Sequence, residues 1–453
     1  MSRILEEAID ACTPELEELT KKIWNTPEVG WHEKNAVAWT AEVLEAHGFA
    51  VEVGAYGLPT VIRAVWGQGK PVMGFAGEYD ALPGLSQKVQ TEQEPVKRGA
   101  AGQGCGHNLL GVGVVGACIG LKAEMEAKGL AGTIVFYGCP AEELLTGKGF
   151  MARYGAFKEC DFMITWHPAT SNRNTIGKMT GLEGAIFSFR GRTAHAAGNP
   201  QDGRSALDAV QIMNIGCEFL REHVTMDVRM HYSVLEGGLA PNIVPETAAV
   251  KYFVRAMTRE AIEDVFARLV RCAEGAAHMT DTTFEIERLG GCYPTLQNKV
   301  MAAVMQEARA EIPMQDWTEE ELAFADAINR HSPFYKAGET VPLDNTLREL
   351  ENYDGYGSTD YGDCQHICPG IQNTDCTSAT LAGGHSWMIT ACSGSSIGRK
   401  GMLRAAKVMA LGAVKMLEKP ELIEAAKAEF AEEMKGKSYI CPITDEVRWP
   451  YED

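Results

Sequence analysis

The spacing of hydrophobic residues changes several times along the chain, and each change predicts a different element. Residues 2–48 carry apolar positions at helical spacing, interrupted by a turn at Asn25–Pro27, and predict two helices. After them, short apolar runs bounded by Gly or Pro predict strands, and a longer Gly- and Ala-rich run predicts a buried helix. These segments are the strands at residues 50–53, 60–65 and 72–76, the helix at 111–128 and the strand at 132–137. Such alternation is typical of an α/β fold whose sheet is mixed but largely parallel and flanked by helices.

A self-contained pattern begins near Gly181. Its segments follow the order βαββαβ, which is the split ferredoxin-like motif. They are residues 185–190, 205–223, 230–235, 247–255, 259–279 and 283–289. The α/β pattern resumes near Pro294, with helices expected at 297–310 and 401–417 and a strand near Ile371. The sequence therefore predicts a larger domain of residues 1–180 and 293–453, into which a domain of residues 181–292 is inserted.

The composition narrows the class of protein. The formal net charge of -19 disfavours binding to nucleic acid or to an anionic membrane surface. The 13 cysteines show no paired spacing, so we expect thiols in a reducing compartment rather than a framework of disulfides. The N-terminal segment is acidic and lacks the apolar core of a signal peptide, and we therefore expect a cytoplasmic protein.

Chemically versatile side chains gather in four short clusters, each at a predicted junction between a strand or loop and the next element. The clusters are Gly104–Asn108, Cys139–Glu143, Trp166–Pro168 and Gly383–Trp387. Open α/β sheets bind their ligands at such junctions. Together the clusters offer a thiolate, three imidazoles and two adjacent carboxylates, a set suited to Zn²⁺ or Mn²⁺. In a metal-dependent hydrolase one glutamate can bind metal, while the other takes a proton from water and returns it to the leaving group.

Each cluster also has an ordinary structural explanation. A His beside a Pro is commonly a satisfied structural residue, a Cys before Gly-His is commonly just buried, and paired glutamates commonly begin a solvated helix. The joint occurrence of all four clusters favours the metal site over these separate explanations.

The clusters, in this order, resemble the dinuclear metallo-amidohydrolase and peptidase family of aminoacylases and glutamate carboxypeptidases. Within that family the chain is most similar to the branch that contains the B-type p-aminobenzoyl-glutamate hydrolases. Further matching segments run through nearly the whole chain and include Gly77–Leu82, Ala194–Ala197, Gly203–Asp208 and Ser358–Asp363. The resemblance implies a catalytic domain, an inserted lid and dimerisation domain, and two divalent metal ions, Mn²⁺ or Zn²⁺. It also implies a homodimer formed through the inserted domain, or a pair with a paralogous subunit.

Carried over residue by residue, the resemblance implies a complete catalytic centre. Glu142 matches the general base, and the implied metal ligands are Cys105, His107, Glu143, His167 and His385. Relatives with a carboxylate-bridged site carry a His in the segment where this chain has Glu78, so the thiolate form of the site is implied. Asp80 would not bind the metal itself but would orient an imidazole that does.

The inserted domain contributes further implied residues. His195 resembles the histidine that is offered to the neighbouring subunit's site, where it stabilises the oxyanion formed as water attacks the amide. Asn242 and Arg255 resemble the residues that hold the substrate's carboxylate. A core histidine, a turn asparagine and a solvated arginine are the structural alternatives for these three positions.

These residues imply metal-dependent hydrolysis of the amide bond of an N-acyl amino acid, with an aromatic acyl group as in p-aminobenzoyl-glutamate, which releases the acid and the amino acid. An amidohydrolase acting on indole-acetyl-aspartate or a dipeptidase of the same family are alternatives. So is a noncatalytic or regulatory subunit that binds an acyl-amino acid. A cysteine hydrolase with Cys105 as nucleophile is a further alternative, but His107 is placed better to be a co-ligand than to be its base.

Overall fold

The computed structural model describes residues 3–449, and the chain divides into two compact units. The first unit comprises Met1–Gly177, Leu296–Asp354 and Cys364–Tyr439, and the second comprises Lys178–Thr295, Gly355–Asp363 and the chain from Ile440 onward. The sequence pattern predicts that all of residues 293–453 belong to the larger domain. The structure instead groups 355–363 with the inserted segment, because Thr180 donates a hydrogen bond to the Gly357 carbonyl (3.0 Å) and lies 3.1 Å from the Ser358 hydroxyl.

The first unit is built on a six-stranded sheet with the strand order β1-β2-β4-β3-β5-β10. The strands are β1 (Ala50–Val53), β2 (Ile62–Gln68), β3 (Val72–Glu78), β4 (Gly132–Cys139), β5 (Phe162–Ala169) and β10 (Gly370–Cys376). Strands β4, β3, β5 and β10 are parallel to one another, whereas β2 is antiparallel to both β1 and β4. The mixed, largely parallel sheet predicted from the sequence is thereby confirmed.

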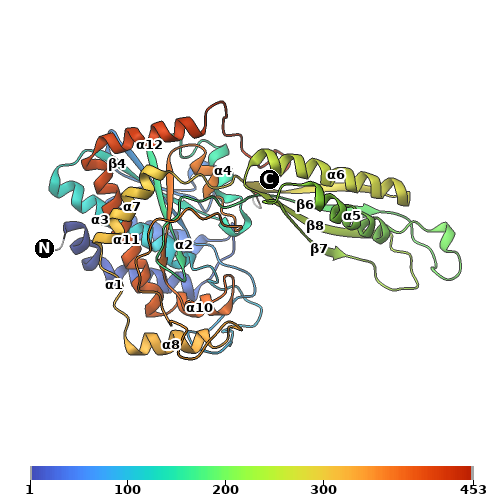
Figure 1. Ribbon diagram of the computed structural model, residues 1–453, viewed down its shortest axis with the longest axis horizontal. Coiled ribbons are helices and arrows are strands. Elements are labelled where there is room, and N and C mark those ends of the chain that lie inside the picture. The colour runs from blue at the N-terminus through green and yellow to red at the C-terminus, as the bar shows by residue number, and fades with distance from the viewer. Residues whose placement is uncertain (1–2, 450–453) are drawn as a thin grey trace. The chain divides into compact units, whose positions relative to one another are not determined.

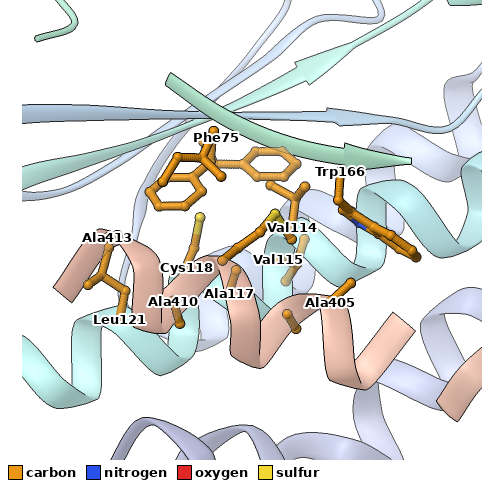
Figure 2. Close-up of a cluster of buried hydrophobic side chains, with 14 of the residues drawn as sticks. Phe75, Val114, Val115, Ala117, Cys118, Leu121, Trp166, Ala405, Ala410 and Ala413 are labelled. Atoms are coloured by element: carbon orange, nitrogen blue, oxygen red, sulfur yellow. The ribbon is translucent and has the colours of Figure 1, made fainter. Parts of the chain in front are cut away.

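Two long helices form the centre of the first unit's core (Figure 2). Helices α3 (His107–Lys128) and α11 (Ser396–Glu418) cross beneath the sheet, with small side chains such as Ala117 and Ala410 along their contact. Phe75 on β3 and Trp166 on β5 cover them from the strand side. By length and composition α3 could span a membrane, but 89% of its most apolar window is buried inside the protein, as in the core helix of a globular domain.

The other helices of the first unit surround this core. They are α1 (Ile4–Asn25), α2 (Lys34–Ala46), α4 (Gly147–Arg153), α7 (Lys299–Glu311), α8 (Glu319–Asn329), α10 (Trp387–Ser393) and α12 (Pro420–Glu433); the short α9 (Tyr361–Gln365) joins the two units along the chain. The sequence analysis did not assign α8, α10 or α12. Helix α8 carries a capping box formed by Thr318 and Glu321, which is a local signal for a helix start.

The second unit is an antiparallel four-stranded sheet, β7-β8-β6-β9, covered by two helices (Figure 1). Its elements are β6 (Gly181–Arg190), α5 (Ala206–Leu220), β7 (Arg229–Glu236), β8 (Thr247–Ala256), α6 (Arg259–Thr280) and β9 (Thr283–Cys292). Alternate residues of β8 from Ala248 to Ala256 are buried, because every second side chain faces the helices. The predicted βαββαβ order is confirmed.

Candidate metal centre

Six of the predicted site residues meet, together with Glu78, at one edge of the first unit's sheet, where its parallel strands end. Strand β3 ends at Glu78, β5 carries His167, and α3 begins at His107, two residues after Cys105. The start of α3 lies directly against the end of β3 because Gly111 has no side chain: a Cβ atom there would lie 2.4 Å from the Glu78 carbonyl oxygen. The local fold thus brings a thiol, imidazoles and carboxylates to a single place.

Potential ligand atoms in this cluster form three sets, and within each set they lie within 4.8 Å of one another. The sets are Cys105 with His107 and His167, Cys105 with Glu143 and His385, and Glu78 with His107 and Glu142. Cys105 belongs to two sets, each of which contains at least one His. The arrangement therefore suits two neighbouring divalent cations, and Cys105 would be a candidate ligand in both sets.

Hydrogen bonds orient the imidazoles of the buried His107 and the partly buried His167 toward this centre. His107 Nδ1 lies 2.9 Å from Asp80 Oδ1, and His167 Nδ1 lies 2.7 Å from the Pro168 carbonyl oxygen. Each Nδ1–H donates to its acceptor, which leaves the Nε2 lone pair for a metal. His167 Nε2 lies 3.4 Å from the Cys105 sulfur, so the freed nitrogen faces the thiol.

A strained turn presents the two glutamates. It forms a short 3₁₀ helix between Ala141 (φ 53°) and Leu145 (φ 55°), both in the left-handed region. Such residues cost of order 1–3 kcal/mol each and persist only where the surroundings fix them. Here the buried Glu33 accepts a hydrogen bond from the Ala141 N–H (2.8 Å), and Asp80 Oδ2 accepts one from the Glu143 N–H (2.9 Å).

His385 closes the cluster on its exposed side. Its Nε2 lies 3.5 Å from Glu143 Oε2, and 59% of its side chain is exposed. It follows Gly383 and Gly384 and itself has a positive φ of 51°. The site is therefore buried at His107 and open to solvent at His385.

Electrostatics favour a cation among these side chains. Burial raises the pKa of the Cys105 thiol to about 12 and the pKa of the Glu143 carboxyl to about 7. Burial, together with the nearby His107, lowers the pKa of His167 to about 4, so that its ring is neutral and able to bind metal. Burial opposes the ionisation of Glu78, but the Lys148 ammonium 2.6 Å away lowers the pKa of Glu78 below its ordinary value. A bound cation would stabilise the ionised thiolate and carboxylates.

Three polar atoms at the site test whether these residues fit a metal. Glu78 Oε2, His107 Nε2 and Glu143 Oε1 are buried and have no hydrogen-bond partner among residues 3–449. A buried polar atom without a partner is costly, and native proteins contain few of them. All three belong to potential ligands of one centre, and a coordinated cation would satisfy them. The residues present therefore fit a metal site.

The second unit holds the other predicted residues, His195, Asn242 and Arg255. The Nδ1 atom of His195 accepts hydrogen bonds from the backbone N–H groups of Ala197 (3.2 Å) and Gly198 (2.9 Å). The ring proton is therefore on Nε2, which is available as a donor.

The local structure brings Asn242 beside His195 and places Arg255 elsewhere in the same unit. The Asn242 carbonyl accepts a hydrogen bond from the Ala196 N–H (3.0 Å). Arg255 lies on β8, where its guanidinium donates to the Ser358 hydroxyl (2.6 Å).

Three buried charged residues beside the centre, Glu33, Glu78 and Lys148, were not predicted from the sequence as part of it. Glu78 was treated only as a departure from relatives, and neither Lys148 nor Glu33 was singled out. Glu78 carried a usable signal, since it is a carboxylate at the carboxyl end of an apolar strand. Lys148 and Glu33 lie in segments with no pattern that predicts their burial.

Comparisons with known proteins identify the family of the chain. Residues 179–281 match the peptidase dimerisation domain. The chain is 36% identical to the B-type polypeptide of p-aminobenzoyl-glutamate hydrolase from Escherichia coli, with 98% of each chain covered. It is 28% identical to the Xaa-Arg dipeptidase of Mus musculus, over 95% of this chain and 92% of that one. A dinuclear metal-binding peptidase of the M20 family from Bacillus subtilis has the same fold, with a TM-score of 0.61 at 17% identity, over 90% of this chain and 99% of that one. The family predicted from the sequence is confirmed, and the chain belongs to the M20 family of metal-dependent peptidases and amidohydrolases.

Proposed function

We propose that this enzyme hydrolyses the amide bond between an acyl group and an amino acid, with two divalent ions held by Cys105, His107, Glu143, His167 and His385. One observation carries the proposal. Cys105 belongs to two sets of ligand atoms at the ends of parallel strands, and a further buried carboxylate, Glu142, lies beside both sets without belonging to either. That arrangement supports a metal pair with a neighbouring proton acceptor.

The chain's own residues then have distinct tasks. When bound, the ions supply Lewis acidity that polarises the amide carbonyl and acidifies water. Glu142, whose Oε2 lies 3.8 Å from His107 Nε2, accepts the proton of the attacking water and delivers it to the amide nitrogen. The strained turn holds the Glu142 carboxylate in place for both transfers.

The second unit supplies groups that act on the substrate. We assign the Nε2–H of His195 to stabilising the oxyanion that forms in the centre of a neighbouring subunit. Asn242 and Arg255 are assigned to the carboxylate of the amino acid, for which a guanidinium fork is well shaped. The match to a peptidase dimerisation domain supports a dimer, and we propose a homodimer formed through this unit.

The relatives guide the choice of substrate. One is named for p-aminobenzoyl-glutamate and another for Xaa-Arg dipeptides. We propose an aromatic acyl-glutamate as the preferred class, because the first relative is the more similar and covers the whole chain. The 13 cysteines of the sequence show no paired spacing, which supports a reducing compartment, and we propose that the enzyme acts in the cytoplasm.

A substrate panel tests the proposal. The full-length protein, stripped with a chelator and reloaded with Mn²⁺ or Zn²⁺, is assayed with p-aminobenzoyl-glutamate, indole-acetyl-aspartate and a Xaa-Arg dipeptide. We expect hydrolysis that needs metal and is fastest with p-aminobenzoyl-glutamate. Fastest turnover of the dipeptide would favour the dipeptidase alternative, and full activity of the stripped protein would refute the proposed mechanism.

A further inference from the structure

A buried ion pair lies beside the candidate metal centre. Lys148 Nζ on α4 is 2.6 Å from Glu78 Oε1 at the end of β3, and neither side chain is more than 1% exposed. Burying two charges is costly, and such a pair is weak evidence for a gain in stability. Its position next to potential ligands suggests a role beyond stability.

The two oxygens of Glu78 have different surroundings. Oε1 accepts the hydrogen bond from Lys148, whereas Oε2 is buried, has no hydrogen-bond partner among residues 3–449 and lies 3.4 Å from His107 Nε2. Because Nδ1 faces the Asp80 carboxylate and donates to it, the neutral form of the His107 ring carries its lone pair on Nε2. In that neutral form two electron-rich atoms face each other, and a cation shared by them would take the place of a proton on Nε2.

The third set of potential ligands contains both Glu78 and His107. Glu78, His107 and Glu142 each offer an atom within 4.8 Å of the others. With Glu78 as the carboxylate ligand in this set, Glu142 does not have to bind the metal. Its carboxylate then stays available for proton transfer.

We propose that Glu78 is an additional ligand for the cation on the His107 side, and that Lys148 is a positioning residue which fixes one Glu78 oxygen so that the other faces His107. The inference rests on the metal centre of the proposed function, and it adds a residue pair to that centre. The competing explanation is that the pair only stabilises the fold.

Three variants separate these explanations: E78Q, K148M and the double variant E78M/K148M. Each full-length protein is stripped with a chelator and titrated with Mn²⁺ by calorimetry, and the thermal unfolding of the metal-free form is recorded. We expect wild type to bind two ions and E78Q to bind one of them at least about tenfold more weakly, as is typical when a metal site loses such a group. K148M should weaken the same ion, since Glu78 is then no longer fixed.

The double variant decides between the two roles. It replaces both buried charges by apolar side chains of similar length, so the metal-free protein should regain a melting temperature close to wild type. Its metal affinity should remain as weak as that of E78Q. Recovery of wild-type affinity in the double variant, or wild-type affinity in E78Q, would overturn the proposal.

A matched control lies in the second unit. Glu183 is equally buried and pairs with Arg259 (2.6 Å) and Arg288 (2.9 Å). E183Q should lower the melting temperature without changing Mn²⁺ affinity, whereas an equal loss of affinity in E183Q would assign the effect of E78Q to general destabilisation and overturn the inference. Turnover is not part of this test: an inactive wild type that binds two ions would refute only the proposed function.

Discussion

Replacing Asp80 by Asn should weaken metal binding while leaving every proposed ligand in the chain. Asp80 is 1% exposed and accepts two hydrogen bonds of 2.9 Å, from His107 Nδ1 and from the Glu143 backbone N–H. An amide has a single oxygen, so one of the two donors would face an NH₂ group instead of an acceptor. Either the imidazole of His107 or the turn that carries Glu143 would lose its orientation.

The loss of Mn²⁺ affinity in D80N can be estimated from the hydrogen bonds that the substitution removes. A hydrogen bond to a charged group contributes about 1.5–3 kcal/mol, and loss of a group that orients a ligand typically lowers metal affinity by about 10- to 100-fold. We therefore expect D80N to bind Mn²⁺ about 10- to 100-fold more weakly in a calorimetric titration of the stripped protein. The stoichiometry should still reach that of wild type at high Mn²⁺ concentration.

Asp161 provides a matched control in the same unit. Its carboxylate accepts a hydrogen bond from the Val72 N–H (2.7 Å) and pairs with Lys70 and Lys427, away from the ligand sets. D161N should lower the melting temperature and leave Mn²⁺ affinity unchanged. Wild-type affinity in D80N, or an equal loss in D161N, would refute the reasoning about Asp80.

Three further predictions concern other parts of the centre. C105S should lose more affinity for Cd²⁺ than for Mn²⁺ in parallel titrations, because a thiolate prefers softer metals, and equal losses would argue against a thiolate ligand. Burial and the Asp80 carboxylate raise the pKa of Glu33 from 4.5 to about 8. The folded, metal-free protein therefore holds the Glu33 proton more tightly than the unfolded chain does. The stability that this proton contributes is fully present below pH 4.5 and is lost as the pH rises to about 8. The melting temperature of E33Q should accordingly fall less than that of wild type over this range, and parallel curves would contradict the assignment. H195A should keep both ions but lose about 10²- to 10³-fold in kcat, the usual cost of an oxyanion donor, and a wild-type kcat would remove His195 from the mechanism.

The site residues that could be predicted from the sequence are those next to the ends of predicted strands. Cys105, His107 and His167 lie at junctions between strands, loops and helices, and parallel strands bring such junctions to one edge of the sheet. The βαββαβ order of the second unit was also readable, since each element keeps one hydrophobic period along its length.

The ion pair of Glu78 and Lys148 could not be predicted in the same way. The partners are 70 residues apart in the chain, and each is a charged residue that ordinarily lies on the surface. Their pairing depends on the tertiary fold, which brings Lys148 of α4 to the end of β3, and no local hydrophobic period records that placement. Helix α12 was not predicted from the sequence for a related reason. Only two of its residues, Ile423 and Ala426, are buried, so it has no continuous apolar stripe.

In the proposed mechanism Glu142 moves the proton, and other residues hold the metal. The most direct test of this mechanism measures metal content and kcat of E142Q beside wild type, with p-aminobenzoyl-glutamate as substrate. We expect E142Q to retain the metal content of wild type and to lose about 10²- to 10⁴-fold in kcat, the usual contribution of a general base. A metal-loaded E142Q with a kcat close to wild type would contradict it.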